Sequence, residues 1–340
     1  MVAVTVVVCA YTLDRWQDLV ASVRSAAAQQ PTPDELVLVV DHNPELLERA
    51  SRELQPEIPG LEVIANERRK GLSGARNTAL ERASGEVVVF LDDDASASDG
   101  WLASLLEPYG RPDVLGVGGS AAPRWPTGLS RPATLPEGSH GRGVLDWVVG
   151  CTYEGQPLSR APVRNLMGCN MSMRVRPALD AGGFSEDLGR VGRTPLGCEE
   201  TELCIRMQQR RPDGRFLFEP SASVRHRVSP DRLTWSYLLH RGYAEGLSKA
   251  TVAGQVGQDQ ALETERGYVA RVLPGAVLRG LGRAVRGPGR RNGAEGAAAV
   301  VACLAATAAG YARGRVAAAT GRTSFASRPA LGVTAERSGA

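Results

Sequence analysis

Three consecutive aspartates, Asp92, Asp93 and Asp94, follow directly on the apolar run "VVVFL". Three neighbouring carboxylates repel one another, and a buried strand seldom ends in this way unless a cation compensates the charge. Asp92 and Asp94 are one residue apart, so their side chains point the same way in an extended chain. Carboxylate oxygens suit Mg²⁺ or Mn²⁺, which typically bridge to substrate phosphates. We favour a metal site here over the alternative, a solvated turn with ordinary local hydrogen bonds.

A second acidic group, Glu199, Glu200 and Glu202, stands in "GCEETELCIRM". Apolar residues follow at helical spacing, which predicts that these carboxylates open a helix. Acidic residues favour helix N-termini through the helix dipole, and that alone could explain them. Three carboxylates in four positions exceed what capping requires, so one of them is a candidate general base that activates a hydroxyl group.

A third candidate is "RRKGLSGARNTAL", residues 68–80, where glycines and cations lead into a predicted helix with Ser73 as its N-cap. A helix N-terminus beside arginines can bind an anion, and the alternative is a solvated basic loop. The stretch has neither the dinucleotide spacing G-x-G-x-x-G nor the P-loop pattern. His226, in "SVRHRV", is more often structural in such a place, but it is a candidate metal ligand.

The elements that must position these residues alternate between strands and helices. The β-branched runs "AVTVVVCAY", "ELVLVVD", "LEVIAN", "EVVVFLDDD" and "VLGVGG" predict strands, and segments with helical spacing lie between most of them. This order predicts an α/β fold with a mostly parallel sheet and helices on both faces. Ligands bind beyond the carboxyl ends of such strands, where residues 9–11, Asp41 and Asp92–Asp94 are expected to gather.

The remaining chain predicts less regular structure. Residues 120–165 are rich in Pro and Gly and predict a long irregular insertion over the active face. The runs "RFLFEP" and "ASVRHRV" predict two further strands, and a helix is expected at about 233–250. We expect a catalytic domain over 1–250, a helical extension over 251–320 and a disordered tail over 321–340. The Ala-rich run 297–311 is shorter than the roughly 20 residues of a spanning helix, which favours a packed or interfacial helix.

Composition excludes several other classes of protein. The 340 residues carry a net charge of +3, which is too small to indicate nucleic-acid binding. No pair among the six cysteines has C-x-x-C spacing, so reduced thiols are expected rather than a zinc site. The chain begins directly with a strand-like run and shows no signal peptide. These features favour a cytoplasmic location, with the arginines near the Ala-rich helix able to contact the inner face of the cell membrane.

Five motifs in this order resemble glycosyltransferase family 2, which has the GT-A fold. They are "VVVCAYTLDRW", "LVLVVDHNPE", "GLSGARNTAL", "FLDDDA" and "GCEETELCIRM", and the resemblance covers about residues 3–250. Two of the phrases further resemble a bacterial and archaeal subgroup that includes glucosyl-dolichyl phosphate glucuronosyltransferase-like proteins. The resemblance implies an inverting transfer of a sugar from a nucleotide-sugar donor, most simply a UDP-sugar, to the hydroxyl of a glycan or a lipid-linked saccharide.

The resemblance also implies a role for individual residues. It implies Glu200 as the general base and Mg²⁺ or Mn²⁺ bound by Asp92 and Asp94, with His226 as a further candidate ligand. The residues that it implies for donor binding are Ala10, Tyr11, Asp41, Arg76, Asn77, Asp92 and Asp93. Glu199 and Arg241 are expected to contact the acceptor or a phosphate.

The sequence departs from the family pattern at the base, where Glu stands in place of the usual Asp, and it lacks the Q-x-x-R-W motif of processive members. Two alternatives therefore stay open. One is a nucleotidyltransferase acting on a sugar phosphate, which would share the sheet and the metal-binding aspartates. The other is a binding module for nucleotides or glycans that has lost catalysis.

Overall fold

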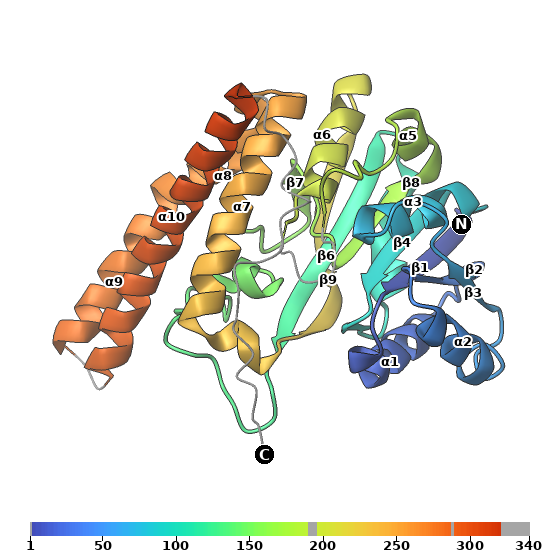
Figure 1. Cartoon of the computed structure of the whole chain (residues 1–340), viewed down its shortest axis with the longest axis horizontal. Helices are drawn as coiled ribbons and strands as arrows, with labels where there is room; N and C mark the ends of the chain where they lie inside the picture. The colour runs from blue at the N-terminus through green and yellow to red at the C-terminus, as the bar shows by residue number, and fades with distance from the viewer. Residues whose placement is uncertain (1, 190–195, 287–288, 321–340) are drawn as a thin grey trace, which may run out of the picture.

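The computed structural model describes residues 2–189, 196–286 and 289–320, and the tail predicted to be disordered lies outside them. A central sheet carries helices on both faces, and α7 to α10 stand together beside the half of the sheet that contains β6 and β9 (Figure 1). This confirms the predicted α/β fold class with a C-terminal helical region. The polar strand ends and the C-terminal helices face each other across a cavity, described below.

The sheet has the strand order β3-β2-β1-β4-β8-β6-β9-β5, with β7 paired to β9. Four strands, β1 (Val4–Ala10), β2 (Glu35–Val40), β3 (Leu61–Ala65) and β4 (Val87–Asp92), run parallel as predicted. The second half is mixed, because β8 (Asn170–Arg174) pairs antiparallel with both β4 and β6 (Val114–Arg124). The sheet is therefore less uniformly parallel than the sequence predicts.

Two apolar layers hold the helices against the sheet. On one face α1 (Trp16–Ala27), α2 (Pro44–Glu53) and α4 (Trp101–Leu106) contribute to one core. On the other face α3 (Leu72–Arg82), α5 (Val175–Asp180) and α6 (Glu199–Arg210) contribute to a second core. The strands between them are buried on both faces, which explains why they read as continuous β-branched runs rather than as alternating patterns.

Two local predictions differ from the structure. Ser73 does not cap α3: Gly71 holds the N-cap position, and the Ser73 hydroxyl instead donates to the Leu188 carbonyl at 2.8 Å. The two runs predicted as separate strands form one strand, β9 (Arg215–Arg227), because an irregularity in its pairing with β6 lets the chain continue past Pro220. Asp93 and Asp94 form a turn after β4, and the chain then continues as a short strand, β5 (Ala95–Ala97).

The irregular region between β6 and β8 is confirmed, and its regular pieces are the 3-10 turn η3 (Asp146–Val149) and β7 (Ala161–Val163). Both contribute to the surroundings of the site: η3 packs in an apolar cluster with α7, α9 and α10, and β7 pairs with β9. Three further 3-10 turns flank helices: η1 (Leu13–Arg15) precedes α1, η2 (Glu107–Gly110) follows α4, and η4 (Pro230–Leu233) precedes α7.

The C-terminal helices are α7 (Trp235–Val256), α8 (Gln258–Arg271), α9 (Leu273–Arg286) and α10 (Arg290–Ala319). The predicted domain boundary at residue 250 falls inside α7, because the helix runs one and a half turns further than expected. The Ala-rich run lies within a helix of 30 residues, and by length and composition alone α10 could cross a membrane. In this structure α10 packs against α7 and α9, and 39% of its most apolar stretch of 18 residues is buried.

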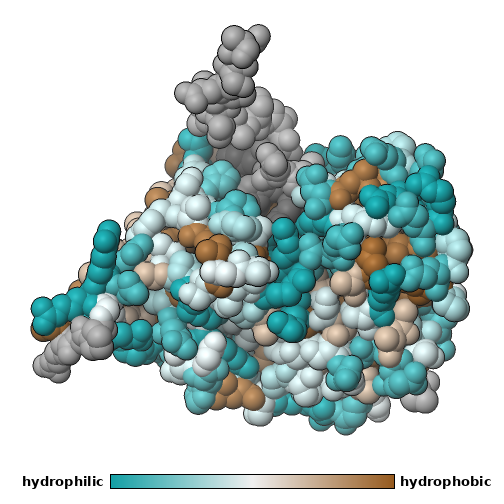
Figure 2. Space-filling view, turned by 90° about the horizontal axis from the view of Figure 1, so that it is seen from below, coloured by the Kyte–Doolittle hydropathy of each residue, from teal (hydrophilic) through white to brown (hydrophobic). Residues whose placement is uncertain are grey.

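Glycines allow α7 and α10 to approach closely. A side chain at Gly246 would meet the Thr307 carbonyl at 2.0 Å, and one at Gly310 would meet the Tyr243 carbonyl at 2.0 Å. The tip where α9 and α10 meet is hydrophilic, and its exposed side chains include Arg283, Arg290 and Arg291. Seen from below, apolar residues form small separate patches on this face of the molecule, with hydrophilic side chains at that tip (Figure 2).

Candidate functional site

A cavity of about 360 Å³ lies between the carboxyl ends of the sheet strands and the C-terminal helices. This is the edge of the sheet where the sequence predicts the polar strand ends to gather. The cavity is lined by Ala10, Tyr11, Asp41, Arg76, Asp92, Asp93, Asp94, Glu199, Glu200, His226 and Arg241, which are all but one of the predicted site residues. Its size falls within the range typical of small-molecule sites.

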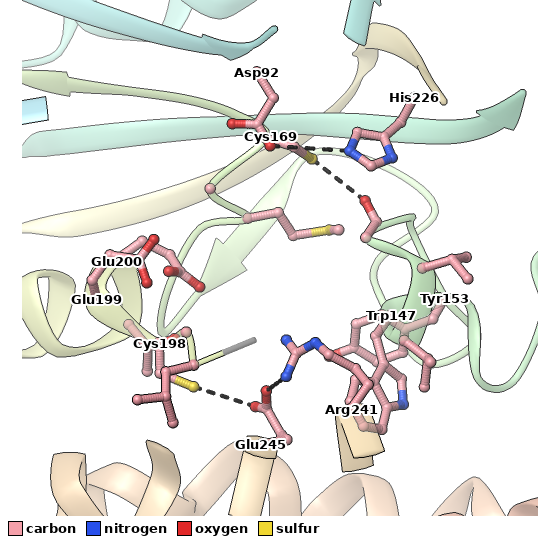
Figure 3. A pocket seen from close by; sticks show the side chains of 18 of the residues that line it. Asp92, Trp147, Tyr153, Cys169, Cys198, Glu199, Glu200, His226, Arg241 and Glu245 are labelled. Atoms are coloured by element: carbon pink, nitrogen blue, oxygen red, sulfur yellow. Dashed lines mark hydrogen bonds and ion pairs between the residues drawn. The ribbon is translucent and has the colours of Figure 1, made fainter. Parts of the chain in front are cut away.

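Asp92, Asp94 and His226 form the acidic end of the cavity. Each offers a ligand atom, and these atoms lie within 4.8 Å of one another. The His226 Nε2 is 3.2 Å from Asp94 Oδ1. It is 4.0 Å from Asp92 Oδ2 (Figure 3). Asp94 lies beside His226 because β5 pairs antiparallel with β9, which puts the next residue, Ala95, opposite His226. The structure thus brings His226 into one cluster with Asp92 and Asp94, although His226 is 134 positions after Asp92 in the chain. The sequence predicts that Asp92 and Asp94 lie together.

The electrostatic state of His226 depends on these carboxylates. Burial alone would lower the pKa of His226, but the adjacent Asp94 carboxylate outweighs it and raises the pKa to about 10. Conversely, although burial would raise the pKa of Asp94, His226 and Arg15 hold it well below its usual range. A divalent cation that uses the His226 nitrogen would therefore displace a proton.

The donor set fits a divalent cation such as Mn²⁺ or Mg²⁺. The two carboxylates supply the hard oxygen ligands that Mg²⁺ and Mn²⁺ prefer, and the imidazole adds one nitrogen ligand. Gly150 (φ 81°) lets the chain after η3 pass directly over the imidazole, because a side chain there would lie 2.9 Å from His226 Cε1. The imidazole is thereby held from behind and keeps its orientation toward Asp92 and Asp94.

Arg15 is a member of the site that sequence reasoning missed. Its guanidinium contacts Asp93 at 2.9 Å and Asp94 at 2.8 Å, and it also lies 5.0 Å from the centre of the Tyr11 ring. Arg232 Nη2 lies 3.7 Å from Asp94 Oδ2, the same oxygen that Arg15 contacts. These cations offset the repulsion within the aspartate cluster. Neither arginine could be predicted, since their positions along the chain have no special spacing relative to residues 92–94.

Arg76 links the two acidic clusters. It is buried, and its guanidinium contacts Asp92 Oδ1 at 3.4 Å, Glu199 Oε1 at 2.8 Å and the Gly168 carbonyl at 2.8 Å. Arg76 projects from the second turn of α3, the helix whose N-terminus the sequence predicts as an anion site. The cation therefore comes from within the helix and not from the loop before it. This contact orients the carboxylates and fixes the distance between them.

Glu199 and Glu200 differ in their partners although they are adjacent. Glu199 is buried and bound to Arg76, while its Oε2 has no hydrogen-bond partner among the described residues. Glu200 is half-buried and forms no ion pair within the described part of the chain, and it lies beside Glu199 at the cavity wall (Figure 3). Burial, and then the Glu199 charge, raise the pKa of Glu200 to about 8, against the opposing effect of Arg76. A free carboxylate with a raised pKa is suited to accept a proton near neutral pH.

Asp41 stands where β2 ends and is held from two sides. Its Oδ2 accepts from the Gly71 amide at 3.0 Å, and its Oδ1 accepts from the Asn66 side chain at 2.6 Å. The carboxylate therefore fixes the start of α3 as well as lining the cavity next to Ala10 and Tyr11. His42, for which no role was predicted, adopts a left-handed conformation (φ 48°) and contacts the same carboxylate at 2.9 Å.

Asn77 is the one predicted site residue that the structure does not bring to the cavity wall. Its side-chain amide donates to the Phe184 carbonyl at 2.8 Å, and its Oδ1 accepts from the Phe184 amide at 2.8 Å. Both polar groups are thus engaged with the backbone between α5 and α6. Because successive helical residues point in directions about 100° apart, Arg76 faces the cavity while Asn77 faces this segment.

Charged side chains of α7 form the wall opposite the acidic pair. Arg241 contacts Glu245 at 2.9 Å, and Lys249 contacts Glu245 at 3.6 Å and Glu265 of α8 at 2.6 Å. The Arg241 guanidinium points into the cavity across from Glu199 and Glu200 (Figure 3). The sequence predicted Arg241 for this region, but it missed the other three, since they are ordinary helix-surface residues by spacing.

Comparisons with known proteins agree on one family. The family model for "Glycosyl transferase family 2" matches residues 5–179. The glucosyl-dolichyl phosphate glucuronosyltransferase of Haloferax volcanii is 32% identical over 247 residues, which cover 72% of this chain and 76% of that protein. The succinoglycan biosynthesis protein ExoM of Rhizobium meliloti is 30% identical over 249 residues, covering 70% of this chain and 71% of that protein.

Two solved glycosyltransferases share the fold. The mannosyltransferase PcManGT of Pyrobaculum calidifontis, solved with GDP-Man and Mn²⁺, aligns with a TM-score of 0.54 at 18% identity, covering 90% of this chain and 87% of that one. GalNAc-T7, solved with UDP, GalNAc and Mn²⁺, aligns with a TM-score of 0.53 at 17% identity, covering 80% of this chain and 56% of that one.

Proposed function

Since the chain belongs to glycosyltransferase family 2, we propose that it transfers a sugar from a nucleotide-sugar donor to an acceptor hydroxyl in a single, inverting displacement. The observation that carries this proposal is the placement of Glu200 in one cavity with the Asp92, Asp94 and His226 cluster. The donor is a UDP-sugar, and the acceptor is a lipid-linked saccharide, as the name of the Haloferax relative suggests for that protein.

The strand ends bind the donor in this proposal. Ala10, Tyr11 and Asp41 would contact the nucleotide base, while Asp92, Asp94 and His226 would hold Mg²⁺ or Mn²⁺. When bound, such an ion offsets the negative charge of the departing nucleoside diphosphate. Arg76 holds the Asp92 and Glu199 carboxylates in position by contacting both, and Asp93 positions Arg15. Asn77 contributes by fixing the segment near Phe184 rather than by touching the donor.

Glu200 is the general base. Its carboxylate takes the proton from the acceptor hydroxyl while that oxygen attacks the anomeric carbon, and the bond between this carbon and the diphosphate oxygen breaks. The Oε2 of Glu199, which has no partner among the described residues, can accept a hydrogen bond from a second hydroxyl of the acceptor sugar. Arg241 can contact an acceptor phosphate. Residues 1–250 supply the donor and base groups, and the helices over 251–320 complete the acceptor side.

The enzyme works next to a membrane in this proposal, on the cytoplasmic side. Its lipid-linked acceptor requires such proximity, and the exposed arginines at the tip of α9 and α10 can contact anionic lipid. The six free cysteines are consistent with a reducing compartment.

The substitution Glu200→Gln tests the assignment of the base. It should lower transfer by about 10²- to 10⁴-fold, because the amide cannot accept the proton, and it should leave donor binding with Mn²⁺ unchanged. Nucleotide release and calorimetry measure the two properties. Glu202→Gln is the matched control on the same helix, since Glu202 pairs with Arg206 and does not line the cavity.

Transfer retained in Glu200→Gln would assign the base to another residue. The nature of the product separates the two remaining readings of the sequence. Release of a nucleoside diphosphate together with a glycoside supports the proposal, whereas release of pyrophosphate would indicate a nucleotidyltransferase, and no release with any acceptor would indicate a binding module.

A further inference from the structure

Behind the charged wall the cavity continues into a slot between α8, the start of α9 and α10. We define the apolar slot by the cavity-lining residues Val269, Leu273, Val300, Cys303 and Leu304. Thr307, which lies one turn further along α10, donates its hydroxyl to the Cys303 carbonyl, so its polar group is already used.

The apolar slot runs from the interior to the surface. Leu273, Val300 and Cys303 are buried, with 6%, 1% and 1% of their surface exposed, whereas Val269 and Leu304 are each 38% exposed. The two exposed residues therefore mark an apolar mouth at the surface. Exposed apolar side chains that continue a cavity indicate a binding surface for an apolar group.

Arg241 lies between the slot and the acidic pair. Gly197, two residues before Glu199, lies next to the Arg241 Nη2, and Gly242, the residue after Arg241, packs against Cys303. Among the described residues only the Nη1 of Arg241 has a protein acceptor, Glu245, so the other donors of its guanidinium are available. The cavity thus contains, in order, the carboxylates of Glu199 and Glu200, the Arg241 guanidinium that can bind an anion, and the apolar slot.

The charge of this wall favours an anion. Three cations, Arg164, Arg241 and Lys249, face two carboxylates, Glu245 and Glu265. The pairing leaves one positive charge in excess within this group, in a partly buried setting where a phosphate would form charge-assisted hydrogen bonds. An uncharged lipid would leave that charge without a partner.

A neighbouring hollow fits a hydrocarbon less well. It has a volume of about 540 Å³ and shares Tyr153, Arg164 and Tyr268 with the main cavity. Its rim carries the exposed charged residues Glu263 and Arg271, so an apolar chain there would meet charged groups.

We propose that the apolar slot binds the hydrocarbon chain of a lipid phosphate that carries the acceptor sugar, with the phosphate at Arg241 and the sugar at Glu199 and Glu200. This inference rests on the proposed function and adds to it the residues that recognise the lipid. The chain enters at the mouth formed by Val269 and Leu304, so the enzyme can act while the end of the chain remains in the bilayer.

Simple alkyl phosphates test the inference without the true acceptor. Decyl phosphate, butyl phosphate and decanol are titrated below their micelle concentrations into the full-length protein and followed by calorimetry. Decyl phosphate should bind the most tightly of the three, with up to about fourfold in affinity for each methylene that enters the slot. Equal affinity for decyl and butyl phosphate would overturn the proposal, and so would equal affinity for decyl phosphate and decanol.

Two matched substitutions locate the chain. Leu304→Glu puts a charge at the mouth and should remove at least tenfold of the preference for decyl over butyl phosphate. Leu278→Glu makes the same change on α9 at a residue that is 69% exposed and does not line the cavity, and it should leave the preference unchanged. Equal losses in both variants would mean adsorption to the protein surface and would refute the slot.

A separate titration keeps the inference distinct from the proposed function. Binding of a nucleoside diphosphate with Mn²⁺ is measured in the wild type and in Leu304→Glu, and it should be the same in both. If the wild type binds decyl phosphate in the slot but no nucleotide, the proposed function fails while the slot stands. If nucleotide binds and decyl phosphate shows no chain-length preference, only the slot fails.

Discussion

At the proposed donor end of the cavity the polar groups come from a sheet, whereas at the opposite end they come from helices and an irregular loop. Asp41 and Asp92 each stand at the end of a parallel strand, and pairing with β1 fixes both strands in register. Arg241 and Lys249 project from α7, and their positions depend on how α7 packs against α8 and α10. Strand pairing fixes side chains through many backbone hydrogen bonds, while helix packing depends on the side chains themselves.

The difference teaches which part of the site can vary. A metal and a diphosphate demand fixed oxygen ligands, and a sheet edge supplies them. An acceptor needs a wall of suitable shape and charge, which helices can change by a few substitutions without disturbing the strands. We therefore expect changes at the donor end to abolish the reaction and changes at the helical end to alter stability or acceptor choice.

The substitution Asp94→Asn at the donor end should have the largest effect. It removes a charge that both His226 and Arg15 contact, and transfer should fall on the order of 10³-fold, because several kcal/mol of metal-dependent charge stabilisation are lost. Nucleotide release with Mn²⁺ measures the effect. Asp99→Asn is the control on the same segment, since Asp99 is exposed and lies outside the cavity. Similar activity of both variants would break the proposed distinction between the two ends.

The substitution Gly246→Ala at the helical end should lower stability instead. The new methyl group would meet the Thr307 carbonyl, and such overpacking typically costs about 1–3 kcal/mol. Scanning calorimetry and proteolysis of α10 follow the change, while donor binding with Mn²⁺ should persist. Gly254→Ala on the same helix meets nothing within 4 Å, so it should be neutral or stabilise by up to about 1 kcal/mol. A parallel loss of donor affinity in Gly246→Ala would show that the two ends do not act separately.

The smallest effect is the pH dependence of transfer. With the pKa of Glu200 raised to about 8, its carboxyl is protonated and inactive as a base below that pH, and it becomes active as pH rises. With Mn²⁺ and donor saturating at each pH, the rate should increase roughly tenfold between about pH 7 and pH 9 and level off above. Initial rates over this range, with calorimetry of the donor as control, measure it. A rate that does not change with pH would exclude Glu200 as the titrating base.

The alternation of strands and helices, and with it the fold class, followed from period and composition. The β-branched runs before Asp41 and Asp92 are buried on both faces, so their pattern has only one reading. The spacing of Asp92 and Asp94 likewise indicated a shared direction, because alternate residues of an extended chain face the same side. The antiparallel half of the sheet could not be predicted, since nothing in the local pattern of β8 encodes its partners.

The site shows the same division at the level of residues. The sequence by itself determined which carboxylates are clustered, because Asp92 to Asp94 and Glu199 to Glu202 are neighbours along the chain. Only the tertiary structure decided that Arg76 joins the two clusters, that Arg15 pairs with Asp93 and Asp94, and that helices from the end of the chain form an apolar slot. The physical reason is that local spacing fixes the direction of a side chain on its own element, whereas its partner on another element is fixed by how the elements pack.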